Sequence, residues 1–371
     1  MSNLTSALLP LLLLAACAAA RAGDGEAPPK PERVVYAWFP ADMNDWSTAA
    51  VDWSALTHIC FRSAVVQADG TLKIGGGCDP EKIKALVAEA HAHKVKVCVL
   101  VWGSGRKAAD AYLAEHAKTF ADEVLKFLKE YGLDGVNLDD ETWQEHNEVA
   151  GDSNRDRVNL LFKTLHDTLK AANPAYHISY AAPPVISADD KYGAAWLDFK
   201  TIVRHVDHIT FMSYCMFTPT IGWTGSAQPV RGGGKVGAHA RDYDTVIKDY
   251  LEATGGAKEK LVLGLGLHRG GNEWTVSSDK PLAGIYPLLA KPRKLTAAEA
   301  AEQAKRHGRR FDPEQQAPGT ATRITTSSCR AGTRTTSPSP PSSSSPANTA
   351  SPASASGSST ARPSPPPPSS S

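Results

Sequence analysis

Short apolar runs alternate with longer amphipathic segments along this chain. The helical spacing of apolar positions predicts helices at residues 79–93, 110–132 and 155–173. Seven apolar runs have the length and composition of buried strands, at residues 33–39, 56–66, 94–103, 133–139, 176–183, 206–217 and 260–268. Because helical segments separate most of these strands, the pattern predicts a parallel sheet.

The alternation indicates an α/β fold. Seven strands fit a (β/α)8 TIM barrel that is truncated before strand 8 better than they fit a doubly wound sheet. A doubly wound sheet would more often carry a Gly-rich phosphate turn after its first strand, and residues 36–46 contain no Gly. Catalytic groups of a barrel lie at the carboxyl ends of its strands. Trp102, Asp139, Glu141 and Tyr214 occupy such positions, so we expect the active site there.

The fourth predicted strand leads into a polar run. Alternate side chains of a strand share one face, so Asn137, Asp139 and Glu141 should point the same way, while Asp140 faces outward. Two neighbouring carboxyl groups repel each other when ionised, which raises the pKa of one of them. An acid beside a carboxylate is what glycosidic bond cleavage needs. A solvated strand end that leads into a helix N-terminus would have the same spacing, and the spacing alone leaves both interpretations open.

The stretch DGVNLDDE, residues 134–141, resembles the Asp-Gly-x-Asp-x-Asp-x-Glu signature of glycoside hydrolase family 18, the chitinase family. Asn137 replaces the first inner aspartate, which resembles the chitobiase-like and spore-cortex-lytic branches of that family. Residues 211–217 resemble the family's Met-x-Tyr-Asp motif, with Cys215 in place of the aspartate. The similarity covers residues 33–316.

The resemblance implies a retaining mechanism in which the 2-acetamido oxygen of the substrate attacks the anomeric carbon. Glu141 would be the general acid and then the base. Asp139 would orient and stabilise the acetamido N–H, and Tyr214 would donate its O–H to the acetamido carbonyl. Asn137 would hydrogen-bond Asp139, and Met212 would form the floor of the sugar subsite or simply pack the barrel.

Three further residues belong to the expected site. Asp134 matches the first position of the signature and would support the catalytic residues. Tyr36 and Trp102 stand at strand ends, where flat rings could stack on a sugar, and we expect them to bind substrate. The scattered His and Cys residues lack metal-ligand spacing, so we expect neither a metal nor a cofactor.

The sequence therefore predicts a glycosidase that hydrolyses β-1,4-linked N-acetylglucosamine glycans such as chitin or chito-oligosaccharides. A peptidoglycan N-acetylglucosaminidase is one alternative. A non-catalytic, chitinase-like sugar-binding protein is another, although family lectins commonly lose the glutamate that is present here as Glu141. The formal net charge of +1 gives no reason to expect a nucleic acid partner. We expect a carbohydrate partner and a monomeric chain.

Residues 1–22 are predicted to be an export signal, because the apolar segment is too short for a membrane span and small residues follow it. Leu14–Cys17 resembles a bacterial lipobox, in which Cys17 would carry lipid, and ordinary cleavage after Ala22 is the alternative. A linker at residues 23–32 would follow. We expect an exported protein, held in the cell envelope as an outer-membrane lipoprotein or released outside the cell.

The catalytic barrel is expected at residues 33–316, and residues 317–371 are expected to form a disordered, low-complexity tail. From Gly319 onward there is no Leu, Val, Phe, Tyr, Trp, Met, Lys, Asp or Glu, so this stretch cannot build a core. It is either a Ser/Pro-rich spacer or the product of a reading frame that slipped near Pro318. We favour the slipped frame, because a spacer ought to follow a finished barrel.

Overall fold

The computed structural model describes residues 33–39, 41, 46–75, 78–141, 152–186, 194–214, 216–217, 223–233, 235–236, 239–240, 242–266, 271–276 and 285–319. All of them belong to the compact unit Met1–Thr322. The predicted export signal, the predicted linker and residues 320–371 lie outside the described residues. Of the helices that the structure describes, none combines the length and the apolar character that a bilayer crossing needs.

Seven parallel strands form one sheet whose order follows the sequence, which confirms the predicted strands. They are β1 (Tyr36–Phe39), β2 (His58–Val66), β4 (Lys96–Gly103), β5 (Gly135–Leu138), β6 (His177–Ala182), β7 (His208–Phe211) and β10 (Leu261–Leu263). Each strand pairs in parallel with the next, and β3 (Leu72–Ile74) pairs antiparallel with β2. A sequential parallel order is that of a barrel wall, whereas a doubly wound sheet reverses its order. Within the described residues, β1 and β10 each pair with one strand, so the wall stays open between them.

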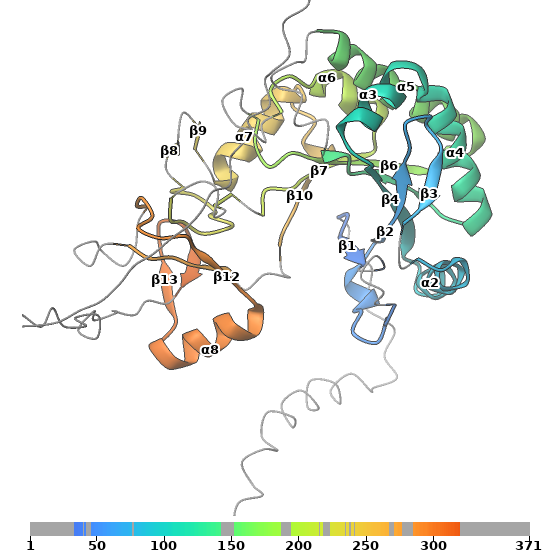
Figure 1. The fold of residues 1–371 in the computed structure, drawn as a ribbon. Helices are drawn as coiled ribbons and strands as arrows, with labels where there is room; N and C mark the ends of the chain where they lie inside the picture. The colour runs from blue at the N-terminus through green and yellow to red at the C-terminus, as the bar shows by residue number, and fades with distance from the viewer. Residues whose placement is uncertain are drawn as a thin grey trace, which may run out of the picture. The chain divides into compact units, whose positions relative to one another are not determined.

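Helices follow most of the strands. Those described are α2 (Pro80–Ala92), α3 (Arg106–Glu115), α4 (Ala117–Tyr131), α5 (Asp152–Ala172), α6 (Phe199–His205), α7 (Tyr243–Ala253) and α8 (Ala297–His307), with short 3-10 turns η2 (Trp53–Ala55) and η5 (Lys258–Lys260). Figure 1 shows α3, α4, α5 and α6 grouped along one side of the sheet. Helix α2 begins as predicted, since the Asp79 carboxylate accepts a hydrogen bond from the Glu81 N–H and Pro80 occupies the first turn.

The single helix predicted at residues 110–132 is in fact two helices, α3 and α4, which meet at His116. The backbone of His116 has φ −120° and ψ 19°, outside helical geometry. The turn at Gly70 packs against this junction, where a Cβ on Gly70 would lie 2.8 Å from the His116 carbonyl oxygen. Helix α4 ends at Gly132, whose φ of +68° is the left-handed conformation in which helices commonly stop at glycine.

The two faces of the sheet differ in chemistry. The helix-covered face belongs to a large apolar cluster that includes Ile59, Phe61, Val97, Val99, Val136, Leu138 and Ile178 from the strands and Phe120, Val124 and Leu128 from α4. On the inner face, Cys60, Cys98 and Leu100 form a separate small apolar cluster. The buried polar residues His58, Asn137, Ser179 and Thr210 alternate with the outward apolar positions of the same strands. The helix-covered face therefore supplies most of the core, and the inner face carries polar groups.

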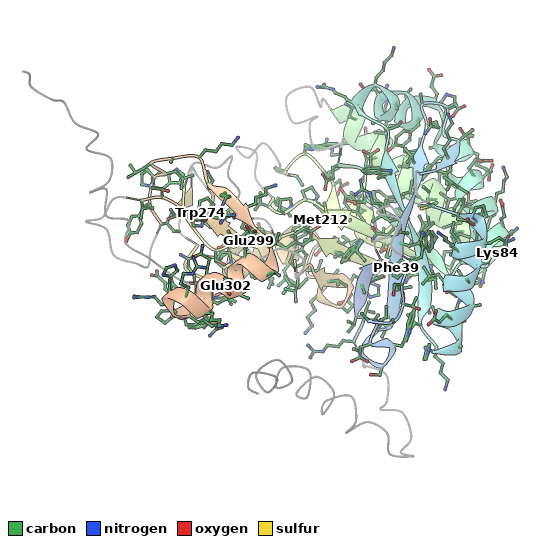
Figure 2. All side chains as sticks on the ribbon, turned by 60° about the horizontal axis from the view of Figure 1, so that its bottom comes forward. Phe39, Lys84, Met212, Trp274, Glu299 and Glu302 are labelled. Atoms are coloured by element: carbon green, nitrogen blue, oxygen red, sulfur yellow. The ribbon has the colours of Figure 1, made fainter. Side chains whose placement is uncertain are left out.

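Small antiparallel ribbons and α8 complete the described chain (Figure 1). The ribbons pair β8 (Lys235–Val236) with β9 (His239–Ala240), β11 (Gly271–Glu273) with β12 (Arg293–Leu295), and β13 (Arg310–Asp312) with β14 (Ala317–Gly319). Gln315, in the turn before β14, accepts hydrogen bonds from the Ser226 and Val230 N–H groups, both at 2.9 Å. Residues 317–319 thus continue a hairpin, and the predicted boundary between 316 and 317 falls inside it. Glu299 and Glu302 project from α8 (Figure 2).

Candidate active site

A pocket of about 360 Å³ lies at the carboxyl ends of β2, β4 and β5. Its lining residues are Arg62, Trp102, Gly103, Gly105, Asp139 and Glu141. The two acids predicted from the sequence therefore share one pocket, together with the predicted aromatic residue Trp102. The pocket is at the end of the strands where barrel enzymes carry their catalytic groups.

The backbone of β5 positions Asp139 at this pocket. Residues 135–138 are all buried, and the Asp139 N–H continues the pairing with β4 by donating a 2.8 Å hydrogen bond to the Val101 carbonyl. Asp140 faces the other way, as predicted, because the Tyr112 hydroxyl of α3 donates a 2.6 Å hydrogen bond to its carboxylate. Asp139 and Asp140 thus project from opposite faces of one extended segment.

Asn137 lies two residues before Asp139, on the same face of the extended segment, and is 1% exposed. Its amide nitrogen donates a 2.8 Å hydrogen bond to the Ser179 hydroxyl of β6, and the expected hydrogen bond to Asp139 is not formed. Asn137 Oδ1 and Asp139 Oδ1 are both buried and have no hydrogen-bond partner among the described residues. A protonated Asp139 carboxyl group would supply the hydrogen-bond donor that these two buried oxygens lack.

The electrostatics of the pocket favour protonated acids. Burial, followed by the charge of Glu141, raises the pKa of Asp139 to about 8, and the nearby Arg62 opposes that rise. Much of the Glu141 side chain is open to solvent. Its carboxyl group is nevertheless partly shielded from water, which raises its pKa, and Asp140 adds to this effect while Arg62 opposes it. At neutral pH the free protein therefore holds a proton on Asp139, beside a second carboxyl group whose pKa is also raised.

Arg62 is a pocket residue that the sequence analysis did not identify. Its guanidinium carbon lies 3.2 Å from the centroid of the Trp102 ring, and Trp102 is 37% exposed. The sequence does contain a sign of its role, since Arg62 lies within the apolar run of residues 56–66. It is two residues after Cys60 and four after His58, so it shares their inward face. A charged side chain in a buried strand is a candidate for function because its burial is costly.

Tyr214 and Met212 follow β7 at the same end of the sheet, but they are not among the lining residues of the pocket. Tyr214 packs against the backbone after β10, where a Cβ on Gly266 would lie 2.9 Å from the Tyr214 Cβ and one on Gly264 would lie 3.2 Å from its ring. Met212, labelled in Figure 2, is 7% exposed. The structure thus brings both residues to the expected end of the strands.

Tyr36 lies at the opposite end of the sheet. It is the first residue of β1 and pairs with His58, the first residue of β2. Its hydroxyl hydrogen-bonds Nε2 of His177, and its ring centroid lies 4.7 Å from that of His58 and 6.3 Å from that of His208. The expected contact between Tyr36 and a sugar in the pocket is therefore not supported, because β1 begins at this residue rather than ending near it.

Asp134 also lies at the amino ends of the strands. Its carboxylate accepts a 2.7 Å hydrogen bond from the Val97 N–H and makes a 2.7 Å contact with Nε2 of His91. Asp207, just before β7, accepts a 2.8 Å hydrogen bond from the Ile178 N–H in the same manner. These aspartates join the beginnings of neighbouring strands. Asp134 therefore helps to hold β5 in place and does not itself contact the pocket at the other end of that strand.

Cys17 and Cys215 lie outside the described residues. Within the part of the chain that the structure describes, no group of three or more His, Cys, Asp or Glu side chains is arranged to hold a metal ion.

Residues 33–324 match the model of the glycosyl hydrolases family 18. Chitinase 1 of Aphanocladium album is 25% identical over 259 residues, which make up 62% of this chain and 59% of that protein. The chain thus spans less than two thirds of the length of this curated relative. A glycoside hydrolase family 18 N-acetylglucosaminidase from Paenibacillus barengoltzii has a similar solved structure, with a TM-score of 0.62, 21% identity and coverage of 77% of this chain and 84% of that chain. The Group IV chitinase of Ostrinia furnacalis in complex with allosamidin gives a TM-score of 0.61 with 18% identity, over 77% of this chain and 82% of that chain. These two structures show that the fold is shared.

Proposed function

The chain belongs to the glycosyl hydrolases family 18, and from this premise we propose that it hydrolyses β-1,4-linked N-acetylglucosamine glycans, with Glu141 as general acid and base. The observation that carries the proposal is the position of Asp139 and Glu141 in one pocket, each with a raised pKa. A general acid must keep its proton near the working pH until the leaving group needs it.

In the proposed reaction Glu141 protonates the glycosidic oxygen while the 2-acetamido oxygen of the same sugar attacks the anomeric carbon. Glu141 then accepts a proton from the water that opens the intermediate, so the configuration is retained. Asp139 stabilises the acetamido group, and its buried position keeps that interaction out of competing water. Tyr214 remains the proposed donor to the acetamido carbonyl. Trp102 offers an indole face to the sugar.

The chain is 25% identical to a curated relative called chitinase 1, and it shares its fold with an N-acetylglucosaminidase. We therefore propose chitin and chito-oligosaccharides as the first substrates to test. Peptidoglycan is the alternative substrate, and sugar binding without hydrolysis is the alternative activity.

The test compares the purified protein with its Glu141→Gln variant on chitobiose, chitin and purified cell wall. The amide keeps the shape of the side chain and removes the exchangeable proton, so we expect hydrolysis to fall by several orders of magnitude while sugar binding survives. Glu302→Gln, on the exposed face of α8, is the matched control and should leave activity unchanged. A Glu141→Gln protein that kept most of its activity would contradict the assignment. Binding without hydrolysis by the unaltered protein would identify a sugar-binding protein instead.

We also propose that residues 1–22 direct export and that Cys17 carries lipid at the outer membrane. The support is the LAAC sequence at residues 14–17. Intact-mass measurement of the protein from a bacterial membrane fraction tests this, because a Cys17→Ala variant that differed in mass only by the missing sulfur atom and fractionated in the same way would contradict lipidation.

A further inference from the structure

Strand β2 carries an irregularity next to the pocket. Arg62 pairs with Leu100 of β4, but the next paired residue is Ala64, which pairs with Val101, so one residue of β2 is skipped in the register. Such a bulge shifts the alternation of side chains by one position. Phe61 before the shift and Val66 after it both face the apolar cluster under the helices. Arg62 faces inward by alternation from His58 and Cys60, and the bulge that follows it returns Ala64 and Val66 to the core face.

Arg62 meets two kinds of group in the pocket. Its planar guanidinium stacks on the Trp102 ring at 3.2 Å, a geometry that arginine can adopt and lysine cannot reproduce. It also lines the same pocket as Asp139 and Glu141. Of the described residues that line the pocket, Arg62 alone is cationic. One face of the indole is covered by the guanidinium, and Trp102 is still 37% exposed.

The charges around Arg62 are predominantly negative. The titratable groups that interact with one another here are Cys60 on β2, Asp139, Asp140 and Glu141 after β5, and Tyr180 on β6. Burial is the main cause that raises the pKa of both Cys60 and Tyr180. Cys98 on β4 and then Asp139 add to it at Cys60, and the three carboxyl groups add to it at Tyr180, so both groups are neutral at physiological pH. Without a cation, burial and mutual repulsion would keep both Asp139 and Glu141 protonated over a wider pH range.

We propose that Arg62 is a positioning residue for the reaction. Its contact with the Trp102 ring fixes the guanidinium, whose positive charge favours the state in which Asp139 and Glu141 together carry one proton. This inference rests on the proposed function. A pair with one proton can supply an acid for the leaving group once that proton is on Glu141, which leaves Asp139 as the carboxylate for the acetamido group, whereas a fully protonated pair has no carboxylate. The stack on Trp102 holds the guanidinium in place, and its charge acts on both acids.

The experiment measures the carboxyl 13C chemical shifts of Asp139 and Glu141 during a pH titration without substrate, and then the pH profile of kcat/KM on chitobiose. In Arg62→Gln we expect the pKa of each acid to rise by about one unit, and both limbs of the activity profile to move to higher pH. Arg62→Lys keeps the charge but loses the planar stack, so its titration should stay near that of the unaltered protein while KM rises. Arg306→Gln, on the exposed face of α8, is the control and should change neither readout.

A purely structural role for Arg62 would give the same carboxyl titration in the Gln and Lys variants as in the unaltered protein, and that result would overturn the proposal. If Arg62→Gln fails to fold, Arg62→Met, which preserves more of the apolar stem, gives the same comparison. The proposed function is judged separately. Absence of hydrolysis by the unaltered protein contradicts the function itself, whereas normal hydrolysis with an unchanged titration in the variants contradicts only the assignment of Arg62.

Discussion

The Tyr112 hydroxyl of α3 donates a 2.6 Å hydrogen bond to the Asp140 carboxylate, and this contact fixes the direction of the residues on either side. Asp140 is 4% exposed and points toward the helices. Asp139, its neighbour, consequently points into the pocket, and Glu141 lines the same pocket. The least exposed acid of the three thus has a positional role, since it anchors the segment that carries the two candidate catalytic groups.

Gly103 is the first place to test this anchor. A Cβ at this position would lie 2.2 Å from Asp140 Oδ1, so Gly103→Ala must displace the carboxylate or the strand end. We expect the free energy of unfolding to fall by roughly 1–3 kcal/mol, as for other overpacked sites, and activity to fall because Asp139 and Glu141 move with Asp140. Urea denaturation and chitobiose hydrolysis measure the two effects.

Gly319→Ala is the control for that experiment, because a Cβ at Gly319 would have no atom within 4 Å. A double variant, Gly103→Ala with Asp140→Ala, removes the clashing carboxylate and should lose less stability than the two single changes added together. Additive losses would show that the Gly103 Cβ does not act through Asp140.

Asp139→Asn should stabilise the protein while it impairs catalysis. The pKa of Asp139 is about 8 in the fold and 3.8 in its absence, so between these values the folded state holds a proton that the unfolded chain has released. Stability due to this group is therefore greatest at low pH and falls as pH rises toward 8. A neutral amide removes the penalty, and we expect a gain of up to about 5 kcal/mol at pH 7.5. Thermal unfolding should show the gain at pH 7.5 and lose it near pH 4, and an equal gain at both pH values would mean that the effect is not ionic.

Some elements of this protein follow directly from its sequence. The seven strands were predictable because each apolar run is bounded by helix or turn signals, and Asn137, Asp139 and the outward Asp140 followed from simple alternation. Tyr36 was placed at the wrong end because an apolar run does not reveal where pairing begins. The run begins at Arg33, whereas β1 begins at Tyr36. That difference of three residues moves the tyrosine from the middle of the predicted strand to its first position, where it contacts His58 and His177 at the amino ends of the strands.

Other features depend on contacts between distant residues. The break between α3 and α4 falls at His116, where the Gly70 turn packs, and nothing in the local helical pattern marks it. Alternation within β2 turns Arg62 to the inner face, but its contact with Trp102 depends on the register between β2 and β4. The resemblance to a family identified the acids that belong to its signature and missed an arginine that does not.

The substrate-assisted mechanism gives a further prediction. Because the attacking group belongs to the sugar, glycans that lack the N-acetyl group should be inert, and the first product should retain the anomeric configuration. Proton NMR of the early reaction on chito-oligosaccharides distinguishes the two anomers. Fast turnover of a plain β-glucoside, or early appearance of the inverted anomer, would rule out an acetamido nucleophile and leave the Asp139 and Glu141 pair to act by the two-carboxylate route.

The layer of histidines at the amino ends of the strands should make the fold sensitive to acid. Burial is the main cause that lowers the pKa of His58 to about 4 and that of His177 to about 2. The ring centroids of these two residues lie 4.6 Å apart, and Tyr36 and His208 complete the layer. Lys96 and His208 also lower the pKa of His58, while Asp134 and Asp207 oppose them.

Above pH 6.5 His58 is neutral in both states and adds no pH dependence. As pH falls from 6.5 toward 4, only the unfolded chain takes up the proton, so the free energy of unfolding decreases, by roughly 3 kcal/mol for His58 alone. His58→Gln should flatten the dependence of unfolding free energy on pH in that window, whatever it does to stability at pH 7. His307→Gln, near the end of α8, controls for the loss of one histidine. Urea denaturation at half-unit pH steps measures both slopes, and equal slopes in His58→Gln and the unaltered protein would mean that the layer is not what acid disrupts.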